Sequence, residues 1–393
     1  MHQEITTITR TEDLARFVEA AKSAPYVTID TEFLRERTYW SKLCLIQLAI
    51  PPASTAKDNG GEAVLVDPLA DGLSLEPLYD LFRHKQTVKV FHAARQDLEI
   101  FHHDAGLFPD PLFDTQVAAM VCGFGEQVGY ETLVRKIVRA NLDKSSRFTD
   151  WSRRPLSDAQ KSYALADVTH LRAIYEFLFA ELARSGRESW VKEEMAILED
   201  PETYTTRPDE AWLKVRTRSN SPRFLAILRE LARFREAYAQ GKDVPRSRVF
   251  KDDAMIELAS TKPETEAELN RSRLLPREAR KGEIAQGILS AVKAGLGARD
   301  LPQPKREEPG KPGNPALSEL LRVLLKAKAD ELGVASKLIA SAADLDSLAT
   351  GERDLPALKG WRAEMFGQDA LRLVRGEIAL SARDGAVCIV PAA

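Results

Sequence analysis

The first half of the chain alternates short apolar runs with amphipathic segments. The runs YVTID, CLIQLAI, EAVLVD and VKVF are rich in β-branched and aliphatic residues, so they predict strands. The segments EDLARFVEAAKSA, LEPLYDLFR and ETLVRKIVR repeat apolar positions three and four apart, so they predict helices. This alternation over residues 1 to about 200 is typical of an α/β domain, with the first three strands spaced as a meander.

From residue 207 the pattern becomes helical throughout. RFLAILRELARFREAYAQG, DDAMIELASTKP and a helix ending near Ala294 follow one another, and the chain is helical again from LSELLRVLLKAKADEL to RGEIAL. Between these stretches, GLGARDLPQPKREEPGKPGNP is too rich in proline and glycine for a helix. We therefore predict an α/β domain at 1–204, a helical domain at 207–294, a linker at 295–315 and a second helical domain at 316–393.

Acidic residues recur inside these apolar segments. Asp30 and Glu32 are two apart on a predicted strand and share one face. Asp97 lies on a predicted helix, and Tyr163 and Asp167, four apart, share a helix face. Partly buried carboxylates repel each other and lose hydration, and a hard divalent cation relieves both costs. An edge strand exposing its acids to water is the simpler alternative, but the further acids favour a cation site.

The order of these residues resembles the DEDD exonuclease superfamily. Ser162, not histidine, stands five residues before Asp167, which points to the tyrosine-bearing branch. DTEFLRERTYWSKLCLIQLA, FHAARQDLEIF, FDTQVAAMV and LDKSSRFTDWSRRPLSDAQKSYALADVTHL are similar to the bacterial ribonuclease D family, over nearly the whole chain. The resemblance implies a ribonuclease H-like mixed sheet flanked by helices, followed by two all-α HRDC-type modules, the second containing GWRAEMFG from Gly360 to Gly367.

The same resemblance implies a catalytic set of five residues. Asp30 would bridge two divalent metal ions, Glu32 and Asp167 would hold the ion that carries water, and Asp97 would help to hold the second. Tyr163 would orient the attacking water through its hydroxyl, because a tyrosine with an ordinary pKa of about 10 is a poor base. Magnesium or manganese is expected, since oxygen ligands suit hard cations and no cluster of cysteine and histidine competes.

Residues that contact the substrate are predicted from aromatic and basic side chains. Phe33 and Trp40 could stack on a terminal base, although Phe33 could equally be a core residue. Lys144 and Arg154 belong to the basic and aromatic stretch DKSSRFTDWSRRP and are predicted to contact phosphates, with solvated charges as the alternative. The basic residues between Pro222 and Lys251 predict a second phosphate-binding face.

The histidines and the glycine-rich stretch are assigned supporting roles. His92 is predicted to be a packed, hydrogen-bonded residue near Asp97 and not a metal ligand. His102 and His103 are adjacent on a helix and are expected at the surface. GFGEQVGY lacks the strand and helix that flank a phosphate loop, so a turn is expected there.

The composition of the chain limits the compartment and the binding partners that we expect. The net charge of −3 gives no overall basic field, although a local basic face can still hold phosphates. No apolar run reaches the ~18 residues that span a bilayer, and the start of the chain lacks a signal peptide's features. We expect a cytoplasmic monomer whose Cys44, Cys122 and Cys388 are reduced.

Three functional hypotheses remain at this point. The first, from the family resemblance, is a 3′–5′ exoribonuclease that trims the 3′ ends of tRNA precursors and other RNAs and releases nucleoside 5′-monophosphates. The second is a 3′–5′ DNA exonuclease of the same superfamily, because residues alone do not show how a 2′-hydroxyl is recognised. The third, an inactive RNA-binding scaffold, is disfavoured by the four acids. No G-x-x-x-x-G-K-[ST] motif is present, which excludes a helicase.

Overall fold

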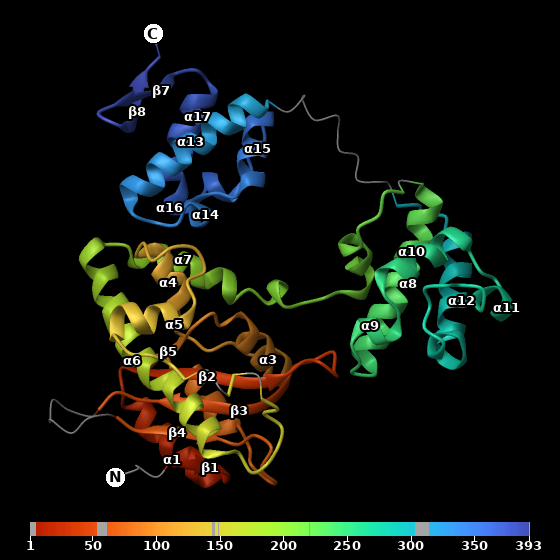
Figure 1. Ribbon diagram of the computed structural model, residues 1–393, viewed down its shortest axis with the longest axis horizontal. Helices are drawn as coiled ribbons and strands as arrows, with labels where there is room; N and C mark the ends of the chain where they lie inside the picture. The colour runs from red at the N-terminus through yellow and green to blue at the C-terminus, as the bar shows by residue number, and fades with distance from the viewer. Residues whose placement is uncertain are drawn as a thin grey trace. The chain divides into compact units, whose positions relative to one another are not determined.

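The structure is a computed structural model that describes residues 5–52, 61–143, 146–147, 149–219, 221–302 and 314–392 (Figure 1). The chain forms two compact units. Unit 1 comprises Met1–Glu32, Cys44–Asp200 and Pro309–Ala393, and unit 2 comprises Phe33–Leu43 and Pro201–Glu308. In the described ranges, no helix is both long and apolar enough to cross a membrane.

A six-stranded mixed sheet forms the centre of unit 1. Its strands are, in sheet order, β1 (Thr7–Ile8), β4 (Ala63–Val66), β3 (Lys42–Ala49), β2 (Tyr26–Leu34), β5 (Val88–Phe91) and β6 (Leu112–Asp114). β2, β5 and β6 run parallel, β1 runs parallel to β4, and β3 runs antiparallel to β4. The four predicted strands are confirmed, and the short strands β1 and β6 at the edges were not foreseen.

Helices cover this sheet, and the longest one carries functional side chains across it (Figure 1). α6 (Asp158–Ser185) begins with a capping box between Ser157 and Gln160 and ends at Gly186 in the left-handed conformation. The buried hydroxyl of Thr28 on β2 donates to the carbonyl oxygen of Val168, 2.8 Å away, and so ties the helix to the sheet. The remaining helices of this part are α1 (Thr11–Lys22), α2 (Glu76–Arg83), α3 (Arg95–Ala105), α4 (Thr115–Val121), α5 (Tyr130–Leu133), η1 (Val134–Val138) and α7 (Glu188–Leu198).

Unit 2 is helical around one apolar core. α8 (Pro222–Gly241) packs against α12 (Gly282–Gly297), α10 (Asp252–Thr261) and the short helix η3 (Pro208–Lys214). The core is built from aliphatic and aromatic side chains, as the apolar spacing of α8 predicted, and α8 also buries Glu230, Arg235 and Glu236. The shorter elements are η2 (Pro201–Thr203), α9 (Arg246–Val249), α11 (Glu266–Leu269) and η4 (Glu278–Arg280).

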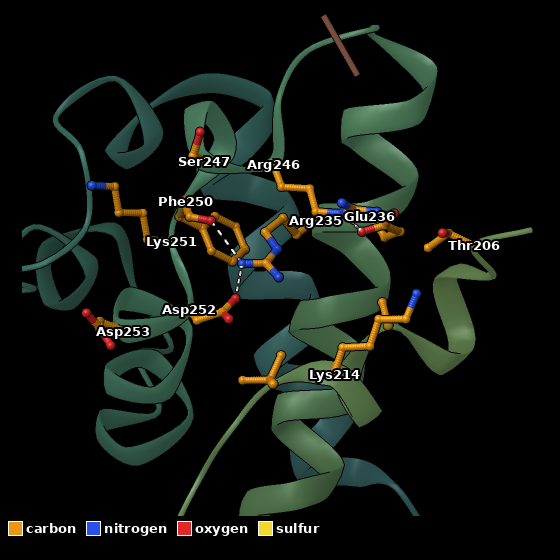
Figure 2. A pocket seen from close by; sticks show the side chains of 12 residues that line it. Thr206, Lys214, Arg235, Glu236, Arg246, Ser247, Phe250, Lys251, Asp252 and Asp253 are labelled. Carbon is orange, nitrogen blue, oxygen red and sulfur yellow. Dashed lines mark hydrogen bonds and ion pairs between the residues drawn. The ribbon is translucent and has the colours of Figure 1, made fainter. Parts of the chain in front are cut away.

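Most of the predicted basic face of α8 and the following loop is used inside unit 2. In Figure 2, Arg235 lies between Phe250 and Asp252, where its guanidinium donates to a backbone carbonyl and to a carboxylate 2.7 Å away. The other basic residues with internal carboxylate or carbonyl partners are Arg223, Arg229, Arg233, Lys242 and Arg246. In the part of the chain that the structure describes, Arg248 and Lys251 keep no such partner. Most cations of this stretch therefore balance internal acids or carbonyls, and a phosphate-binding face stays a prediction.

The last eighty residues are not all-helical. Helices α13 (Pro315–Leu332), α14 (Ser336–Ile339), α15 (Ala342–Thr350), η5 (Pro356–Leu358), α16 (Gly360–Arg362), η6 (Ala363–Gly367) and α17 (Gln368–Val374) precede an antiparallel pair, β7 (Ile378–Arg383) and β8 (Ala386–Pro391). Asp384 and Gly385 form the turn, both with positive φ. The prediction of helix through RGEIAL was therefore wrong at its end, because Asp-Gly is a strong hairpin signal.

This C-terminal part packs within unit 1 and does not stand apart as a second module. The guanidinium of Arg187 donates to the carbonyls of Val121 and Leu332, at 3.0 and 2.5 Å. Gly123, with a φ of +81°, approaches the backbone so closely that a Cβ there would lie 2.3 Å from the carbonyl oxygen of Gly333. Only glycine fits at such a contact.

A buried aromatic and ionic contact completes this packing. Trp361, from the GWR stretch, stacks on Trp190 of α7 with ring centroids 4.4 Å apart. Arg362 forms an ion pair with Glu194 at 2.6 Å, and their side chains are 14% and 9% exposed. Trp361 also donates its indole N–H to Glu194 at 3.3 Å. The negative charge of Glu194 is therefore compensated by two residues of the C-terminal part, Arg362 and Trp361.

We expect Arg362→Ala to lower the free energy of unfolding by about 3 kcal/mol, because removing one partner leaves the buried charge of Glu194 uncompensated. Urea unfolding followed by circular dichroism measures the change. Arg184→Ala is the matched control, since Arg184 forms only an exposed i, i+3 ion pair with Glu181. Equal unfolding midpoints for the two variants would contradict a stabilising contact at Glu194.

Candidate active site

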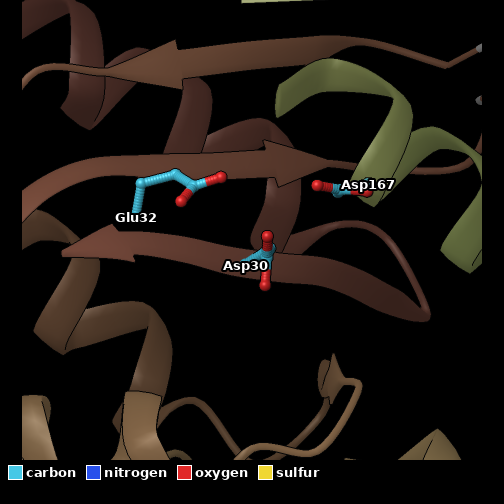
Figure 3. A group of neighbouring side chains, drawn as sticks. All are labelled: Asp30, Glu32 and Asp167. Carbon is cyan, nitrogen blue, oxygen red and sulfur yellow. The ribbon is translucent and has the colours of Figure 1, made fainter. Parts of the chain in front are cut away.

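Three of the four predicted carboxylates converge in unit 1. Asp30 and Glu32 project from β2, and Asp167 projects from α6 (Figure 3). One carboxylate oxygen from each residue lies within 4.8 Å of the other two. In Figure 3 the carboxylates of Glu32 and Asp167 point toward each other, with Asp30 beside the space between them. Strand alternation and helical spacing thus bring together residues 135 positions apart.

Asp97 lies next to this group without belonging to the close set of three. It occupies the first turn of α3, is 6% exposed, and accepts the hydroxyl of Thr31. Burial, followed by the negative charge of Asp30, raises the pKa of Asp97 well above its usual value. Asp97 therefore interacts electrostatically with the other carboxylates, although its own hydrogen bond is with Thr31.

The gathered carboxylates retain protons when nothing compensates their charge. Burial raises the pKa of Asp30 to about 7, and burial followed by the charge of Asp30 raises the pKa of Asp167 to about 8. The pKa of Glu32 rises to about 10, because of burial and then the charges of Asp30, Asp167 and Asp97. Oxygen donors with excess negative charge are the ligand set that hard divalent cations prefer, so these residues fit such an ion.

Tyr163 stands beside the acids on the same helix face as Asp167. The two side chains are hydrogen bonded to each other. Burial first, and then the charges of Asp167, Glu32 and Asp30, raises the pKa of Tyr163. The indole of Trp151, itself buried, lies 6.1 Å from the tyrosine ring. The phenol therefore stays protonated at neutral pH, which suits a hydroxyl that orients water and not one that removes a proton.

A pocket of about 290 Å³ opens onto these side chains. Its lining residues are Asp30, His92, Gly129, Tyr130, Glu131, Thr132, Leu142, Arg147, Tyr163, Asp167 and Leu171. Arg147 is the basic side chain whose charge lowers the pKa of both Glu32 and Asp167. The pocket therefore combines a carboxylate cluster, a hydroxyl and a guanidinium in one place.

Tyr130 is a pocket residue that the sequence analysis missed. Its hydroxyl lies 2.6 Å from the carbonyl oxygen of Asp167 and 3.1 Å from that of Ala166. It therefore fixes the turn of α6 that presents Asp167. The stretch GFGEQVGY had been interpreted only as a turn, but an aromatic residue at the end of a glycine-rich turn was an available signal.

His92 is packed and hydrogen bonded, as predicted. Its Nδ1 lies 3.0 Å from the hydroxyl of Thr115, and its ring is 5.5 Å from that of Tyr130. Burial lowers the pKa of His92. Nearby, the carboxylate of Asp114 accepts backbone N–H groups from Ala93 and Ala94, at 3.1 and 2.8 Å, while it caps α4. These contacts fix the loop that leads into α3 and Asp97.

The predicted substrate contacts are not gathered at this pocket. All five guanidinium N–H groups of Arg154 are taken, by Asp67 and by the carbonyls of Cys44, Trp151 and Arg153, so this residue is a structural tie and not a phosphate contact. Lys144 lies outside the described residues. Phe33 is half-buried and follows Glu32 on β2, so alternation directs it to the opposite face. Trp40 lies in the segment of unit 2 between β2 and β3, edge-on to Tyr39.

The raised carboxyl pKa values predict a pH effect on stability. Asp30 and Asp167 bind protons in the folded chain up to pH values near 7 and 8, but in the unfolded chain only up to about 4. The folded state therefore holds more protons in this window, and the free energy of unfolding falls as pH rises through it.

With a chelator present, we expect Asp30→Asn to raise the free energy of unfolding at pH 8.5 by on the order of 2 kcal/mol, and to have little effect at pH 5. Thermal unfolding at the two pH values measures both effects. Asp71→Asn, at an exposed position, is the control. A stabilisation of equal size at both pH values would refute the assignment of charge repulsion to this site.

Two family models match the chain. The model for a 3′–5′ exonuclease matches residues 5–183, and the model for an HRDC domain matches residues 224–292. The first contains all five residues of the predicted catalytic set. The second falls within unit 2. This match covers the first of the two predicted HRDC-type modules, and residues 316–393 lie outside it.

Whole-chain relatives extend this result. Ribonuclease D of Jannaschia sp. (strain CCS1) is 61% identical over 98% of this chain and 99% of its own. Ribonuclease D of Granulibacter bethesdensis is 49% identical over 95% and 94%. The crystal structure of Escherichia coli RNase D, described as an exoribonuclease involved in structured RNA processing, is 28% identical, covers 95% of this chain and 99% of its own, and has a TM-score of 0.81. The chain belongs to the ribonuclease D family of 3′–5′ exoribonucleases.

Proposed function

We propose that the carboxylate cluster binds two divalent cations, Mg²⁺ or Mn²⁺, and that the chain uses them to release nucleoside 5′-monophosphates from RNA 3′ ends. The observation that carries this proposal is the convergence of Asp30, Glu32 and Asp167 within 4.8 Å, with pKa values raised by burial and mutual repulsion. Divalent ions bound there would lower the pKa of a bound water and stabilise charge on the departing oxygen.

The chain's own residues have distinct roles in this proposal. Asp30, Glu32 and Asp167 would hold the cations directly, and Asp97, restrained by Thr31, would support them from the side. Tyr163 orients the attacking water with a hydroxyl that stays protonated. Asp167 would be held by the cations, and the Tyr163 hydroxyl beside it would then be available to that water.

Phosphate contacts are assigned to basic side chains that line a pocket or are exposed. Arg147 lines the pocket beside the carboxylates and is placed to face the scissile phosphate. In unit 2, Arg248, Lys251 and Lys214 are exposed, and they replace the broader basic face expected from the sequence. Lys214 and Lys251 line one pocket of about 470 Å³ (Figure 2). Such contacts would add affinity that depends on salt and not on sequence.

The proposed substrates are the 3′ ends of tRNA precursors and other RNAs. The Escherichia coli relative is described as acting in structured RNA processing, which supports this class. We further propose that the protein acts as a monomer in the cytoplasm. The domain limits proposed for the chain are 1–204 for the exonuclease domain, 207–294 for the HRDC domain and 316–393 for the C-terminal domain, whose helices are tied to the first.

The decisive experiment uses matched RNA and DNA oligonucleotides with single-stranded 3′ tails. With Mg²⁺ present, we expect stepwise shortening of the RNA from its 3′ end, nucleoside 5′-monophosphates as products, and much slower shortening of the DNA. Product lengths on a denaturing gel and chromatography of the released nucleotides measure both. Faster shortening of the DNA would support a DNA exonuclease instead. Asp30→Asn, with one carboxylate removed, should be inactive on both.

The hydroxyl of Tyr163 is tested by Tyr163→Phe, which keeps the ring and its contact with Trp151. We expect the single-turnover cleavage rate to fall by on the order of 10²-fold, a size typical of losing one positioning group. The four carboxylates remain, so calorimetric Mg²⁺ affinity should barely change. The control is Tyr79→Phe, because Tyr79 lies on α2, away from the lining of the pocket. An unchanged cleavage rate would remove Tyr163 from the mechanism.

A further inference from the structure

The catalytic strand runs directly into a segment that belongs to the helical unit. β2 carries Asp30 and Glu32 and ends at Leu34. The segment Phe33–Leu43, which comprises the end of β2, the start of β3 and the residues between them, clusters with Pro201–Glu308. We call this segment the β2–β3 tip. The end of the strand that presents Glu32 is thus continuous with a segment whose contacts lie in unit 2.

Tyr39 anchors the β2–β3 tip in unit 2. Its ring packs against the apolar core of the helices, with the guanidinium of Arg246 4.8 Å from the ring centroid. Its hydroxyl donates to the carboxylate of Glu236 and accepts N–H groups from Arg246 at 2.8 Å and Gln240 at 3.1 Å. One side chain thereby combines apolar burial, a cation–π contact and a fully used hydroxyl.

The carboxylate that accepts the Tyr39 hydroxyl belongs to a buried residue, Glu236. Glu236 on α8 is 1% exposed, and Arg246 contacts both of its oxygens, at 2.5 and 2.6 Å. A buried carboxylate is costly unless charged and hydrogen-bonding partners surround it. Tyr39 is one of those partners, so release of the tip would leave Glu236 less well compensated. The network therefore favours the docked tip.

Asp243 holds the backbone of the same tip. Its Oδ1 accepts the N–H groups of Tyr39 and Trp40, each at 3.0 Å. Asp243 follows the end of α8 and has a φ of +49°, a left-handed conformation that aspartate and asparagine tolerate better than most residues. Two consecutive backbone groups that would otherwise need water are thus satisfied by one carboxylate.

We propose that the HRDC unit positions the catalytic strand through this lock, formed by Tyr39, Glu236, Asp243 and Arg246. Tyr39 and Asp243 are positioning residues that act on Glu32 through the end of β2. This inference rests on the proposed catalytic role of Glu32. The HRDC unit then contributes to the rate of hydrolysis on substrates too short to bind its surface. Of the two aromatic residues that the sequence suggested for base stacking, Trp40 contributes its backbone N–H to the lock.

Three variants at and near the lock test this inference in the full chain. Asp243→Ala removes the acceptor for two N–H groups. Asp243→Asn keeps an oxygen acceptor and a residue suited to positive φ, so it should restore the lock. Asp253→Ala removes an exposed carboxylate of α10 that touches no residue of the tip, and it controls for general effects on the domain.

Two measurements are made on each variant. Hydrogen exchange detected by mass spectrometry reports the amides of residues 33–43, and kinetics on a short single-stranded RNA at saturating Mg²⁺ give kcat and KM. We expect Asp243→Ala to speed exchange in this segment about 10-fold and to lower kcat by on the order of 10-fold, with a smaller change in KM. Asp243→Asn and Asp253→Ala should remain near wild type in both.

Each other outcome overturns the inference. Unchanged exchange in Asp243→Ala would mean that the lock does not hold the tip in solution. Faster exchange with an unchanged kcat would mean that the lock joins the units without positioning the strand. An equal loss in Asp253→Ala would indicate general destabilisation. If the wild-type chain fails to shorten RNA, the proposed function fails, whereas the exchange measurement still decides whether the lock exists.

Discussion

Mutual repulsion among buried carboxylates is the constraint on which the architecture of unit 1 depends. Asp30, Glu32, Asp97 and Asp167 lose hydration and raise one another's pKa, so no local preference would hold them together. Their positions are imposed by hydrogen bonds of the residues around them. The hydroxyls of Thr28 and Tyr130 bond to carbonyls of α6, the Thr31 hydroxyl bonds to Asp97, and Asp114 fixes the loop before α3. The surrounding hydrogen bonds therefore hold together carboxylates that repel one another.

A basic side chain can compensate an internal acid or contact a phosphate, and its position in the sequence does not show which. Arginines of α8 and the loop after it mostly compensate buried acids or end-of-helix carbonyls inside unit 2. Arg154 does the same in unit 1, and Arg187 and Arg362 tie the C-terminal part to helices α4 and α7. Because these guanidiniums already have internal partners, the number of basic residues in a stretch does not show how many of them are available to a phosphate.

The sequence predicted what depends on local periodicity and missed what depends on distant pairing. The strands β2 to β5, the helix of Tyr163 and the shared faces of the acids follow from spacing alone. The pairing of Arg154 with Asp67, and of Tyr39 with Glu236, joins residues 87 and 197 positions apart. No local rule predicts such partners. The hairpin at Asp384 and Gly385 is a different case, because the Asp-Gly signal is local. The prediction of helix up to RGEIAL did not take this signal into account.

The order of the units along the chain has a consequence for synthesis. Unit 1 is completed by residues 309–393, so its Glu194 and Trp190 stay without Arg362 and Trp361 until the last part of the chain has left the ribosome. The helical unit, encoded before that part, can fold first. The nuclease unit therefore matures last, although its sheet is made first. A nascent chain that stops early carries the carboxylates of the candidate site on a scaffold that is still incomplete.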